Sequence, residues 1–276
     1  MVTKFDIIKP PHQLKDYVLY YWVFEGEASR DLPYTHKMLP NGFSEVIGMY
    51  KGSYAEGENG KSNVRSPTVM VTGQMDKPIS YRLEEDFGIF GACLYPYTLS
   101  ALFSVNGVDL KNRHLPASHF IPAGTSCLES FSNAKTNQER MTHISNFFSQ
   151  TLDQTSGENA TVFEAIRSLL KESKAKVRQV AEEHGLSPRH LQRQCKKFTG
   201  FTPKQLLRIS RIQRALNQPS PQSLTALAMD LEYYDQSHFI QDFKEITGLT
   251  PGDYYGEIPM DLRWQYEGER IEPVDN

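Results

Sequence analysis

Hydrophobic and polar residues follow two different periods along this chain, and the change lies near Pro96. Before that point, short apolar or aromatic runs predict β-strands at residues 17–24, 44–50, 68–72, 79–83 and 88–95. Turn signals separate them, namely Pro40-Asn41-Gly42, Gly52, the polar run 56–63 and Gly73. Several short strands at this spacing indicate a β-sandwich or barrel.

After Pro96 the apolar residues recur at helical spacing. Helices are predicted at 98–105, which we expect to end at Asn106-Gly107, at 127–134 and at 138–152. The last helix carries an apolar stripe of Met141, Ile144, Phe147, Phe148 and Leu152, which would serve core packing or a dimer interface. The polar residues 153–159 predict a linker, and the chain from Thr161 onward is predicted to be helical.

A repeated segment organises the helical part. Residues 186–203, LSPRHLQRQCKKFTGFTP, recur in weaker form at 234–251, YDQSHFIQDFKEITGLTP, with an offset of 48 positions. Ser187 is a good N-cap, Pro188 suits the first helical position, and Gly200 favours the end of that helix. Each copy follows a short amphipathic segment. The duplication therefore predicts two helix-turn-helix units, joined by a helix from Pro203 to about Asn217.

Charge is distributed unevenly over the two copies. The whole chain of 276 residues has a net charge of -3, which by itself discourages binding to nucleic acid. Residues 161–218, however, hold 13 Lys and Arg against 4 Asp and Glu, a balance of +9. Residues 219–256 hold 1 Lys against 6 acidic residues, a balance of -5. Only the first copy lies in a field that favours phosphates.

Length and residue usage limit the remaining classes. A chain of 276 residues predicts two domains. Its three cysteines lie far apart, the N-terminus has no signal-peptide pattern, and no apolar run is long enough to span a membrane, so we expect a cytoplasmic protein. The histidines are scattered without metal-ligand spacing, and we expect neither a metal nor another cofactor.

The first recognition helix has the chemistry of a DNA reader. Its inward face is predicted to be Leu191, Cys195 and Phe198, which leaves Arg189, Gln192, Arg193 and Lys196 outward. Arg donates to O6 and N7 of guanine, and Gln pairs with N6 and N7 of adenine, as direct major-groove readout requires. We expect phosphate contacts or structural salt bridges from Lys197, Lys204, Arg208 and Arg211.

The second recognition helix has weaker DNA chemistry. Its inward residues are predicted to be Phe239, Phe243 and Ile246, with Gln236, Ser237, Ile240, Gln241 and Lys244 outward. Asp242 and Glu245 would repel phosphates unless they are paired.

The two copies resemble the paired signature of the AraC/XylS family of transcription regulators. They read VAEEHGLSPRHLQRQCKKFTGFTP and LAMDLEYYDQSHFIQDFKEITGLTP here, and the resemblance covers about residues 161–255. It implies DNA contact by the outward positions of both units. With their flanking positions, the predicted DNA-binding set is Ser187, Pro188, Arg189, His190, Gln192, Arg193, Lys196, Lys197, Lys204, Arg208, Arg211, Gln236, Ser237, His238, Gln241 and Lys244. Departures from the signature are Glu232-Tyr233 for Gly-Phe, Gln241 for Arg, and Cys195 for Phe.

The N-terminal part resembles, more loosely, the cupin-like sensor domains of such regulators. The resemblance rests on the Leu39-Pro-Asn-Gly42 turn and on GACLYPYTLSALFSV from Gly91. Four aromatic residues would either line an effector pocket or pack in the core: Trp22, Phe43, Tyr81 and Tyr95.

The expected fold is therefore α+β in two domains, a β-rich barrel or sandwich followed by an all-α double helix-turn-helix domain. Residues 1–153 would form the sensing or dimerisation domain, residues 160–256 the DNA-binding domain, and residues 257–276 an acidic, poorly ordered tail. We expect a sequence-specific transcription regulator and not an enzyme. Its expected partners are promoter DNA, RNA polymerase, a small-molecule effector and a second copy, but no membrane. The alternative is a small-molecule-binding or enzymatic N-terminal module with a vestigial DNA-binding domain.

Overall fold

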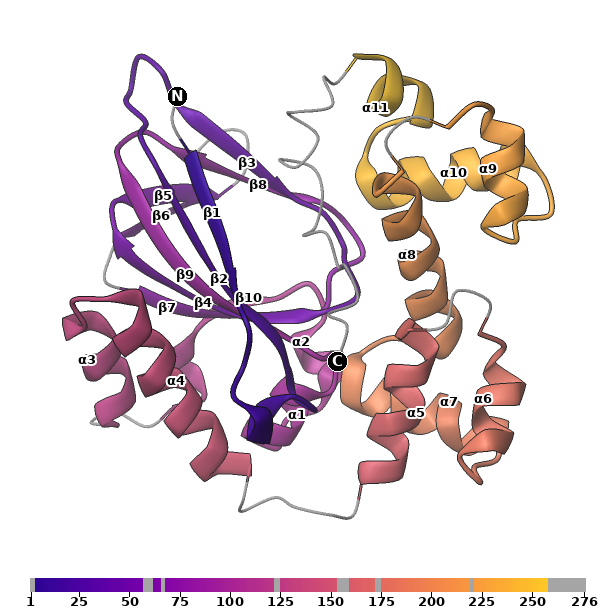
Figure 1. Ribbon diagram of the computed structural model, residues 1–276, viewed down its shortest axis with the longest axis horizontal. Helices are drawn as coiled ribbons and strands as arrows, with labels where there is room; N and C mark the ends of the chain where they lie inside the picture. The colour runs from indigo at the N-terminus through magenta and orange to yellow at the C-terminus, as the bar shows by residue number, and fades with distance from the viewer. Residues whose placement is uncertain are drawn as a thin grey trace.

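A β-rich N-terminal part lies beside an all-helical C-terminal part in the computed structural model (Figure 1). The structure describes residues 3–56, 62–65, 68–121, 125–152, 159–171, 175–218 and 221–257. The predicted linker, apart from Asn159, and the tail beyond residue 257 lie outside these ranges. The expected α+β architecture in two parts is confirmed.

Among its described residues, the N-terminal part contains two antiparallel sheets. The six-stranded sheet has the order β1 (Thr3–Ile8), β2 (Val18–Gly26), β9 (Phe87–Leu94), β4 (Ser44–Lys51), β7 (Thr68–Thr72) and β10 (His114–Pro116). The four-stranded sheet has the order β3 (Tyr34–Met38), β8 (Ile79–Leu83), β5 (Ser53–Glu56) and β6 (Ser62–Arg65).

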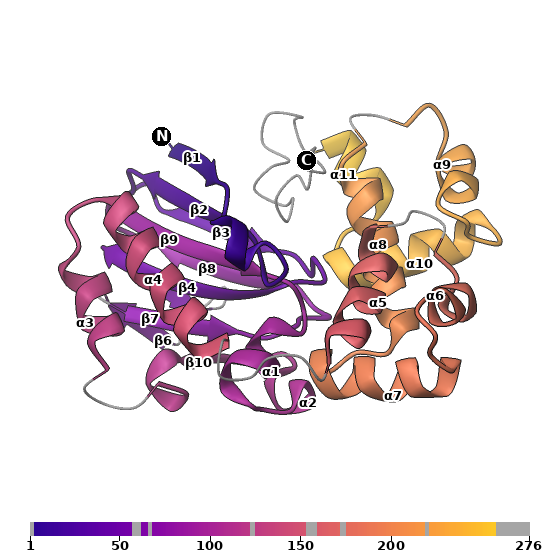
Figure 2. The ribbon, with the colours of Figure 1, turned by 60° about the horizontal axis from the view of Figure 1, so that its bottom comes forward.

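The two faces of the larger sheet pack against different partners, because side chains alternate along each strand. Tyr20, Trp22 and Phe24 point to the inner face, toward the smaller sheet. Tyr21 and Val23 belong to a separate cluster on the outer face. That face is covered by α3 (Ser126–Asn133) and α4 (Asn137–Leu152) (Figure 2). The apolar stripe of α4 joins this cluster and therefore serves core packing.

Three helix predictions in this part can be compared with the structure. The helices at 127–134 and 138–152 are confirmed as α3 and α4. The first, α1 (Thr98–Phe103), ends sooner than predicted, at Ser104, whose φ is 53°. Asn106-Gly107 does not end it. Instead Asn106 begins α2 (Gly107–Leu110), and its Oδ1 accepts a hydrogen bond from the Val108 amide at 3.1 Å. An Asn side chain caps the N-terminus of a helix more readily than it closes a C-terminus. Two short 3₁₀ helices, η1 (His12–Leu14) and η2 (Ala117–His119), complete the part.

In the described residues from 159 to 257, the C-terminal part contains seven helices. They are α5 (Ala160–Lys171), α6 (Val177–Glu183), α7 (Pro188–Thr199), α8 (Pro203–Leu216), α9 (Leu224–Asp230), α10 (Gln236–Thr247) and α11 (Pro251–Glu257). The pairs α6–α7 and α9–α10 are the two predicted helix-turn-helix units, and α8 joins them (Figure 1). Among the described residues, no helix combines the length and the apolar character that a membrane crossing requires.

The two parts touch at the C-terminal end of α7. The Ser100 hydroxyl donates to the Phe198 carbonyl oxygen at 2.8 Å, and both groups are buried. Gly107 and Gly200 approach so closely that a Cβ on Gly107 would lie 2.7 Å from the Gly200 nitrogen. Farther along the interface, Gln213 donates from Nε2 to the Pro40 carbonyl at 2.7 Å, and Arg167 pairs with Asp16. The N-terminal part therefore holds the C-terminal end of α7.

Candidate nucleic-acid interface

The first helix-turn-helix unit is built by local capping chemistry. The Ser187 hydroxyl accepts a hydrogen bond from the His190 amide at 3.2 Å, and Pro188 is the first residue of α7. The preceding turn passes through Gly185 with φ 65°, and Gly200 ends α7 with φ 77°. Both are left-handed conformations that glycine adopts at little cost. The predicted start and end of this helix are confirmed.

The same helix divides into a buried and an exposed face as predicted. Leu191, Cys195 and Phe198 are buried in the core that also contains Val180 and Ala181 of α6. Five residues are exposed on the other face: Arg189, Gln192, Arg193, Lys196 and Lys197. Arg193 Nη2 lies 3.4 Å from His190 Nδ1, and Lys197 Nζ lies 5.0 Å from the centre of the Phe198 ring. The N-terminal half of α7 thus presents bidentate donors, while its C-terminal end contacts the N-terminal part of the chain.

The second unit repeats this arrangement with a longer turn. Asp235 caps α10 by accepting from the His238 amide at 2.8 Å. The left-handed residue of the turn is Glu232, with φ 60°, where the first unit has Gly185. Two residues lie between Glu232 and the N-cap Asp235, whereas one lies between Gly185 and Ser187, and the added residue leaves Tyr234 94% exposed. A left-handed conformation costs a non-glycine residue roughly 1–2 kcal/mol, so this turn is strained.

A buried ion pair joins the second unit to α8. Asp242 on α10 is buried, and its Oδ1 lies 2.8 Å from Arg208 Nε. The Tyr233 hydroxyl donates to Asp242 Oδ2 at 3.1 Å. The other side of the Arg208 guanidinium pairs with Glu245 at 2.5 Å, and these partners raise the Arg208 pKa above its usual value. The condition that Asp242 and Glu245 must be paired is therefore met within the chain.

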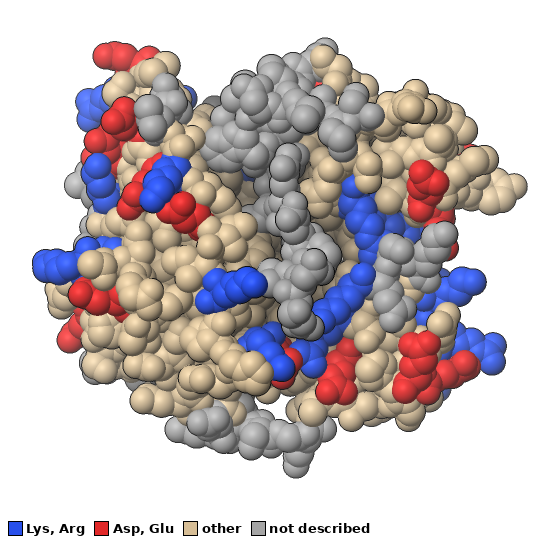
Figure 3. Space-filling model, in the orientation of Figure 1, with Lys and Arg blue, Asp and Glu red and all other residues tan. Residues whose placement is uncertain are grey.

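This pairing concerns the two roles predicted for Arg208 and Arg211. Arg208 bridges α8 to α10, and Arg211 lies 3.7 Å from Glu232 and 5.8 Å from the Tyr233 ring centre. Both arginines thus form ion pairs within the chain, as one of the two predicted roles requires. Figure 3 shows basic side chains along the C-terminal part beside α8, with acidic side chains among them. The basic surplus of one unit and the acidity of the other partly cancel.

The predicted contacts of α10 are only partly available. Ser237, Gln241 and Lys244 are exposed. Gln236 is half-buried and its Oε1 accepts from the Thr225 hydroxyl at 2.7 Å, while His238 Nε2 lies 3.9 Å from Asp242. Ile240, predicted to point outward, packs partly against the core. The second unit therefore offers fewer free groups to a base edge than the first.

The four aromatic residues predicted for an effector pocket all lie in the buried core of the barrel. Phe43 and Tyr95 form one edge-to-face pair with ring centres 6.1 Å apart. Tyr81 instead packs on Tyr54, and the Trp22 ring crosses Gly91, where a Cβ would come within 2.0 Å of it. The structure brings two of the four into direct contact and places the others elsewhere in the same interior.

The same interior, between the two sheets, also contains polar residues that were not predicted from the sequence. Strand register puts Tyr20, Cys93, Glu45, Thr72 and His114 in one row across the larger sheet. His114 lies between the Tyr54 hydroxyl at 2.7 Å and the Thr72 hydroxyl at 2.6 Å. Burial raises the pKa of Glu45 to about 7 and lowers the pKa of His114 to about 4. A glutamate within the apolar run SEVIGMY was the available signal for Glu45.

The buried side chains of Gln74 and Glu45 have polar atoms without a hydrogen-bond partner among the described residues. Gln74 is 2% exposed, and within the described part of the chain neither of its amide atoms has a hydrogen-bond partner. The same holds for Oε2 of Glu45, which is 5% exposed. Buried polar groups are normally satisfied, so these two mark a place where a bound molecule could complete the network.

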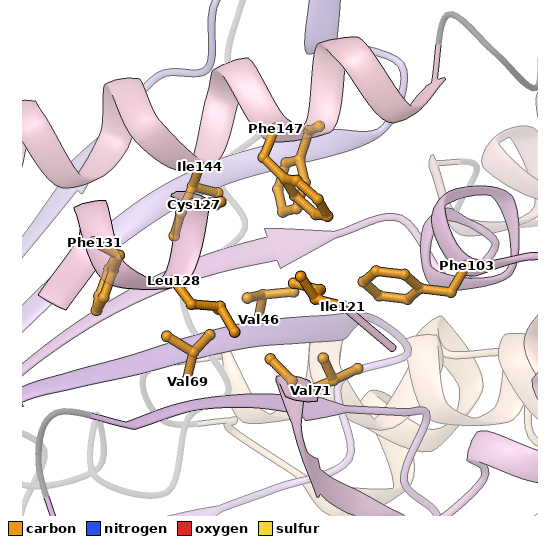
Figure 4. Close-up of a pocket in the computed structure, with 12 residues that line it drawn as sticks. Val46, Val69, Val71, Phe103, Ile121, Cys127, Leu128, Phe131, Ile144 and Phe147 are labelled. Carbon is orange, nitrogen blue, oxygen red and sulfur yellow. The ribbon is translucent and has the colours of Figure 1, made fainter. Parts of the chain in front are cut away.

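A separate apolar cavity lies on the outer face of the larger sheet. Its lining comes from α3, α4, α1 and the sheet, including Leu128, Phe147, Phe103 and Val71 (Figure 4). The volume of this cavity is about 10 Å³. Drug-sized ligands occupy pockets of roughly 300–1,000 Å³, so this cavity is a packing defect and not an effector site.

The cysteines have the environment of structural thiols. Cys195 is buried, and its sulfur lies 3.8 Å from the Thr199 hydroxyl. Burial raises the pKa of Cys195 to about 12 and that of Cys127 to about 11, and it raises the Cys93 pKa well above its usual value. Thiols that stay protonated are poor nucleophiles. In the ranges that the structure describes, no group of three His, Cys, Asp or Glu side chains could hold a metal ion.

Two capped helix-turn-helix units on a common spacer define a DNA-binding domain, and family comparison identifies its type. Residues 180–256 match the model of a helix-turn-helix domain, and residues 6–116 match a domain of unknown function (DUF6597). The family match and the two capped units together make the C-terminal part a helix-turn-helix DNA-binding domain.

Among solved structures, the chain is similar to ToxT from Vibrio cholerae. The two are 12% identical, the match covers 92% of this chain and 98% of that chain, and the TM-score is 0.46. A DNA-binding transcriptional dual regulator from Escherichia coli K-12 is 24% identical over 40% of this chain and 95% of its own, with a TM-score of 0.30. Curated protein sequences give no significant match.

Proposed function

We propose that this regulator reads a specific promoter sequence by placing α7 and α10 in successive major grooves on one face of the duplex. In the proposal, residues 1–153 form the sensing domain and residues 160–256 the DNA-binding domain. The observation that carries it is the exposed face of α7, where Arg189, Gln192 and Arg193 stand free of the core. These side chain types make bidentate contacts to guanine and adenine.

The proposal divides the remaining predicted contacts by role. Lys196, Lys197 and Lys204 are exposed and are assigned to phosphates, together with Lys244 of the second unit. Gln241 and Ser237 are the exposed candidates for base contact on α10. We assign most of the sequence-specific affinity to the first unit, because acidic residues of the second unit already form ion pairs with Arg208 and Arg211.

The spacing between the two units supports this geometry. The connecting helix α8 has 14 residues and is held to α10 by the Arg208 ion pairs. At 1.5 Å per residue it is about 21 Å long. A capping box between Thr202 and Gln205 fixes its start. A stiff spacer of this kind sets one distance between the recognition helices and so one half-site spacing on DNA.

Selection of genomic fragments with purified full-length protein tests the DNA-reading function. We expect enrichment of one motif, and a footprint with two protected major-groove segments about one helical turn apart. Binding that follows only fragment length and falls with salt in the same way for every fragment would contradict the proposal, because such binding is phosphate attraction alone.

We further propose that a small molecule inside the barrel controls DNA binding. A chain of aromatic rings connects the barrel interior to α7: Phe43, Tyr95, Tyr97, Phe163 and Phe198. The successive ring centres are 6.1, 5.9, 4.2 and 5.1 Å apart. A molecule that moves the Phe43–Tyr95 pair would act on the end of α7 that the sensor part already holds.

The chemistry of the interior supports an uncharged effector with hydrogen-bond donors and acceptors. Gln74 offers a free amide and Glu45 a free oxygen, whereas His114 is kept neutral by its lowered pKa. Glu45, with its pKa near 7, would exclude an anion above neutral pH. Trp22 and Tyr81 would supply apolar contact surface.

Thermal unfolding with a library of neutral polyols, amides and heterocycles tests this effector. A compound that binds only the folded state raises the melting temperature. We expect the shift to disappear in Gln74→Leu and to persist in Phe147→Leu, a control in the outer-face cavity. A shift that Gln74→Leu leaves unchanged would remove the barrel interior from the proposal.

The remaining proposed partners follow from the class of protein. We propose that the regulator acts in the cytoplasm with RNA polymerase, and that a second copy of the chain is a further partner. A bacterial two-hybrid assay against polymerase subunits, with and without the promoter, would test the first of these. The surface for the second copy is a separate question.

A further inference from the structure

Among the residues that the structure describes, the outermost strand of the larger sheet has a neighbouring strand on one side only. Strand β1 stands at the end of the sheet order, and within the described part of the chain it pairs with β2 alone. Figure 2 shows it as the last strand at one margin of the sheet. In an antiparallel ladder, alternate residues point their N–H and C=O groups away from the neighbour. The free side of β1 is therefore a row of donors and acceptors that another strand can use.

The side chains of β1 are apolar on one face. Phe5 is 40% exposed and Ile7 is 49% exposed. Phe5 already packs on Trp22 and Phe24, with ring centres 6.0 and 6.1 Å apart, so its position is fixed by the barrel. Strands that natural proteins leave at an open edge are commonly shielded by proline or by charges that resist pairing. The sequence TKFDII contains no proline and one charge of each sign.

We propose that β1 pairs antiparallel with β1 of a second copy, across a two-fold axis at Phe5, so that the sheet continues through the dimer. In this register the two Phe5 side chains face each other, and Thr3 faces Ile7 of the second copy. Aromatic and β-branched cross-strand pairs are the ones that stabilise sheets. The exposed apolar face of β1 becomes part of a continuous surface.

The charges on β1 favour this register over the two registers that are shifted by one residue. Lys4 and Asp6 flank Phe5 on the opposite face, where their side chains are 66% and 47% exposed and form an ion pair of 2.6 Å within the strand that a second copy's charges can share. With the axis at Phe5, each Lys4 faces the second copy's Asp6, which gives two opposite-charge pairs. With the axis one residue earlier, two Lys4 ammonium groups would oppose each other, and one residue later, two Asp6 carboxylates would do so. Like charges directly opposite in a sheet are destabilising.

The interface is small, which determines how it must be measured. Six residues of strand span about 20 Å, so the area that such a contact buries is smaller than the roughly 800 Å² per partner of a standard interface. We therefore expect a weak dimer in free solution. Two neighbouring sites on one promoter would raise its effective concentration. This inference gives the proposed second copy a surface, but it does not depend on DNA binding.

Charge reversal in the full-length protein without DNA tests the register. Sedimentation velocity across a concentration series should show a monomer–dimer equilibrium for the natural sequence. Lys4→Asp and Asp6→Lys each turn both opposite-charge pairs into like-charge pairs, and each should raise the dimer dissociation constant at least about tenfold. Lys135→Asp, at an exposed site before α4, has the same change in net charge as Lys4→Asp and should leave the constant unchanged.

Mixing the two charge-reversed variants gives the decisive result. In a heterodimer of K4D with D6K, both cross-strand pairs again join opposite charges, so dimerisation should return to about the natural level. A natural protein that stays monomeric at several hundred micromolar would overturn the proposal. So would single variants that dimerise like the natural chain, or a mixture that remains monomeric.

Discussion

Removal of the Asp242 carboxylate should destabilise the second helix-turn-helix unit far more than removal of its neighbour Glu245. Both carboxylates pair with Arg208, but Asp242 is 6% exposed whereas the Glu245 side chain is 58% exposed. Breaking a buried ion pair by deleting one partner costs about 3–5 kcal/mol. Arg208 is partly exposed and keeps Glu245, so we expect Asp242→Ala to cost about 2–3 kcal/mol.

Glu245→Ala should cost at most about 1 kcal/mol, because exposed ion pairs contribute little in water. Urea unfolding followed by circular dichroism at 222 nm measures both values, since most of the helical signal comes from this domain. The double variant Arg208→Ala/Asp242→Ala should lose less than the sum of the two single losses, which isolates the pair itself. Equal losses for Asp242→Ala and Glu245→Ala, or strict additivity in the cycle, would refute a buried ion pair as the link between α8 and α10.

Three further predictions concern the turns, the barrel and the recognition helices. Gly185→Ala should lower the free energy of unfolding by about 1 kcal/mol, because the site has open space but a positive φ. Glu232→Gly should relieve similar backbone strain, but it also removes the ion pair with Arg211. Thermal melts that show no loss of stability for Gly185→Ala would contradict this. Burial raises the Glu45 pKa from 4.5 to about 7. The free energy of unfolding should therefore fall as pH rises between these two values, by up to about 3 kcal/mol relative to Glu45→Gln, and stay level at higher pH. Parallel pH profiles of the two proteins would rule this out. Arg193→Ala should weaken specific binding about tenfold or more and Gln241→Ala less; the reverse order in fluorescence anisotropy would move the assignment of affinity to the second unit.

Local chemistry made part of the fold predictable from the sequence. Ser187-Pro188 and Gly200 bound α7 at the predicted residues, because N-caps and left-handed C-caps depend on the few residues that form them. The strands β7 and β8 were predicted at their observed bounds for a related reason, since each is a compact β-favouring run next to turn residues. In these segments the sequence and its immediate neighbours determine the structure.

Other strands have no local signal of this strength. The segments TKFDII and YTHKM become β1 and β3 although both mix charged and apolar residues, because pairing with β2 and β8 supplies their hydrogen bonds. Strand β6 begins inside the polar run that was predicted to be a turn, and it pairs with β5. Partners from elsewhere in the chain create these elements, so a single-sequence pattern misses them.

The functional residues show the same division. The outward face of α7 follows from helical spacing alone and is confirmed by burial. The role of Arg208 could not be decided from the sequence, because its partner Asp242 lies two helices later and meets it only through packing of α8 against α10. Gln74 carries no pattern at all, and its burial appears only in the folded structure.

Binding of the selected promoter fragment by the double variant Arg189→Ala/Arg193→Ala tests the central claim most directly. At fixed salt, its affinity should fall to that for bulk competitor DNA, while a control with the same loss of charge, Lys171→Ala/Arg178→Ala, should keep its preference for the fragment. Unchanged promoter binding by the Arg189→Ala/Arg193→Ala variant would contradict the assignment of sequence reading to α7.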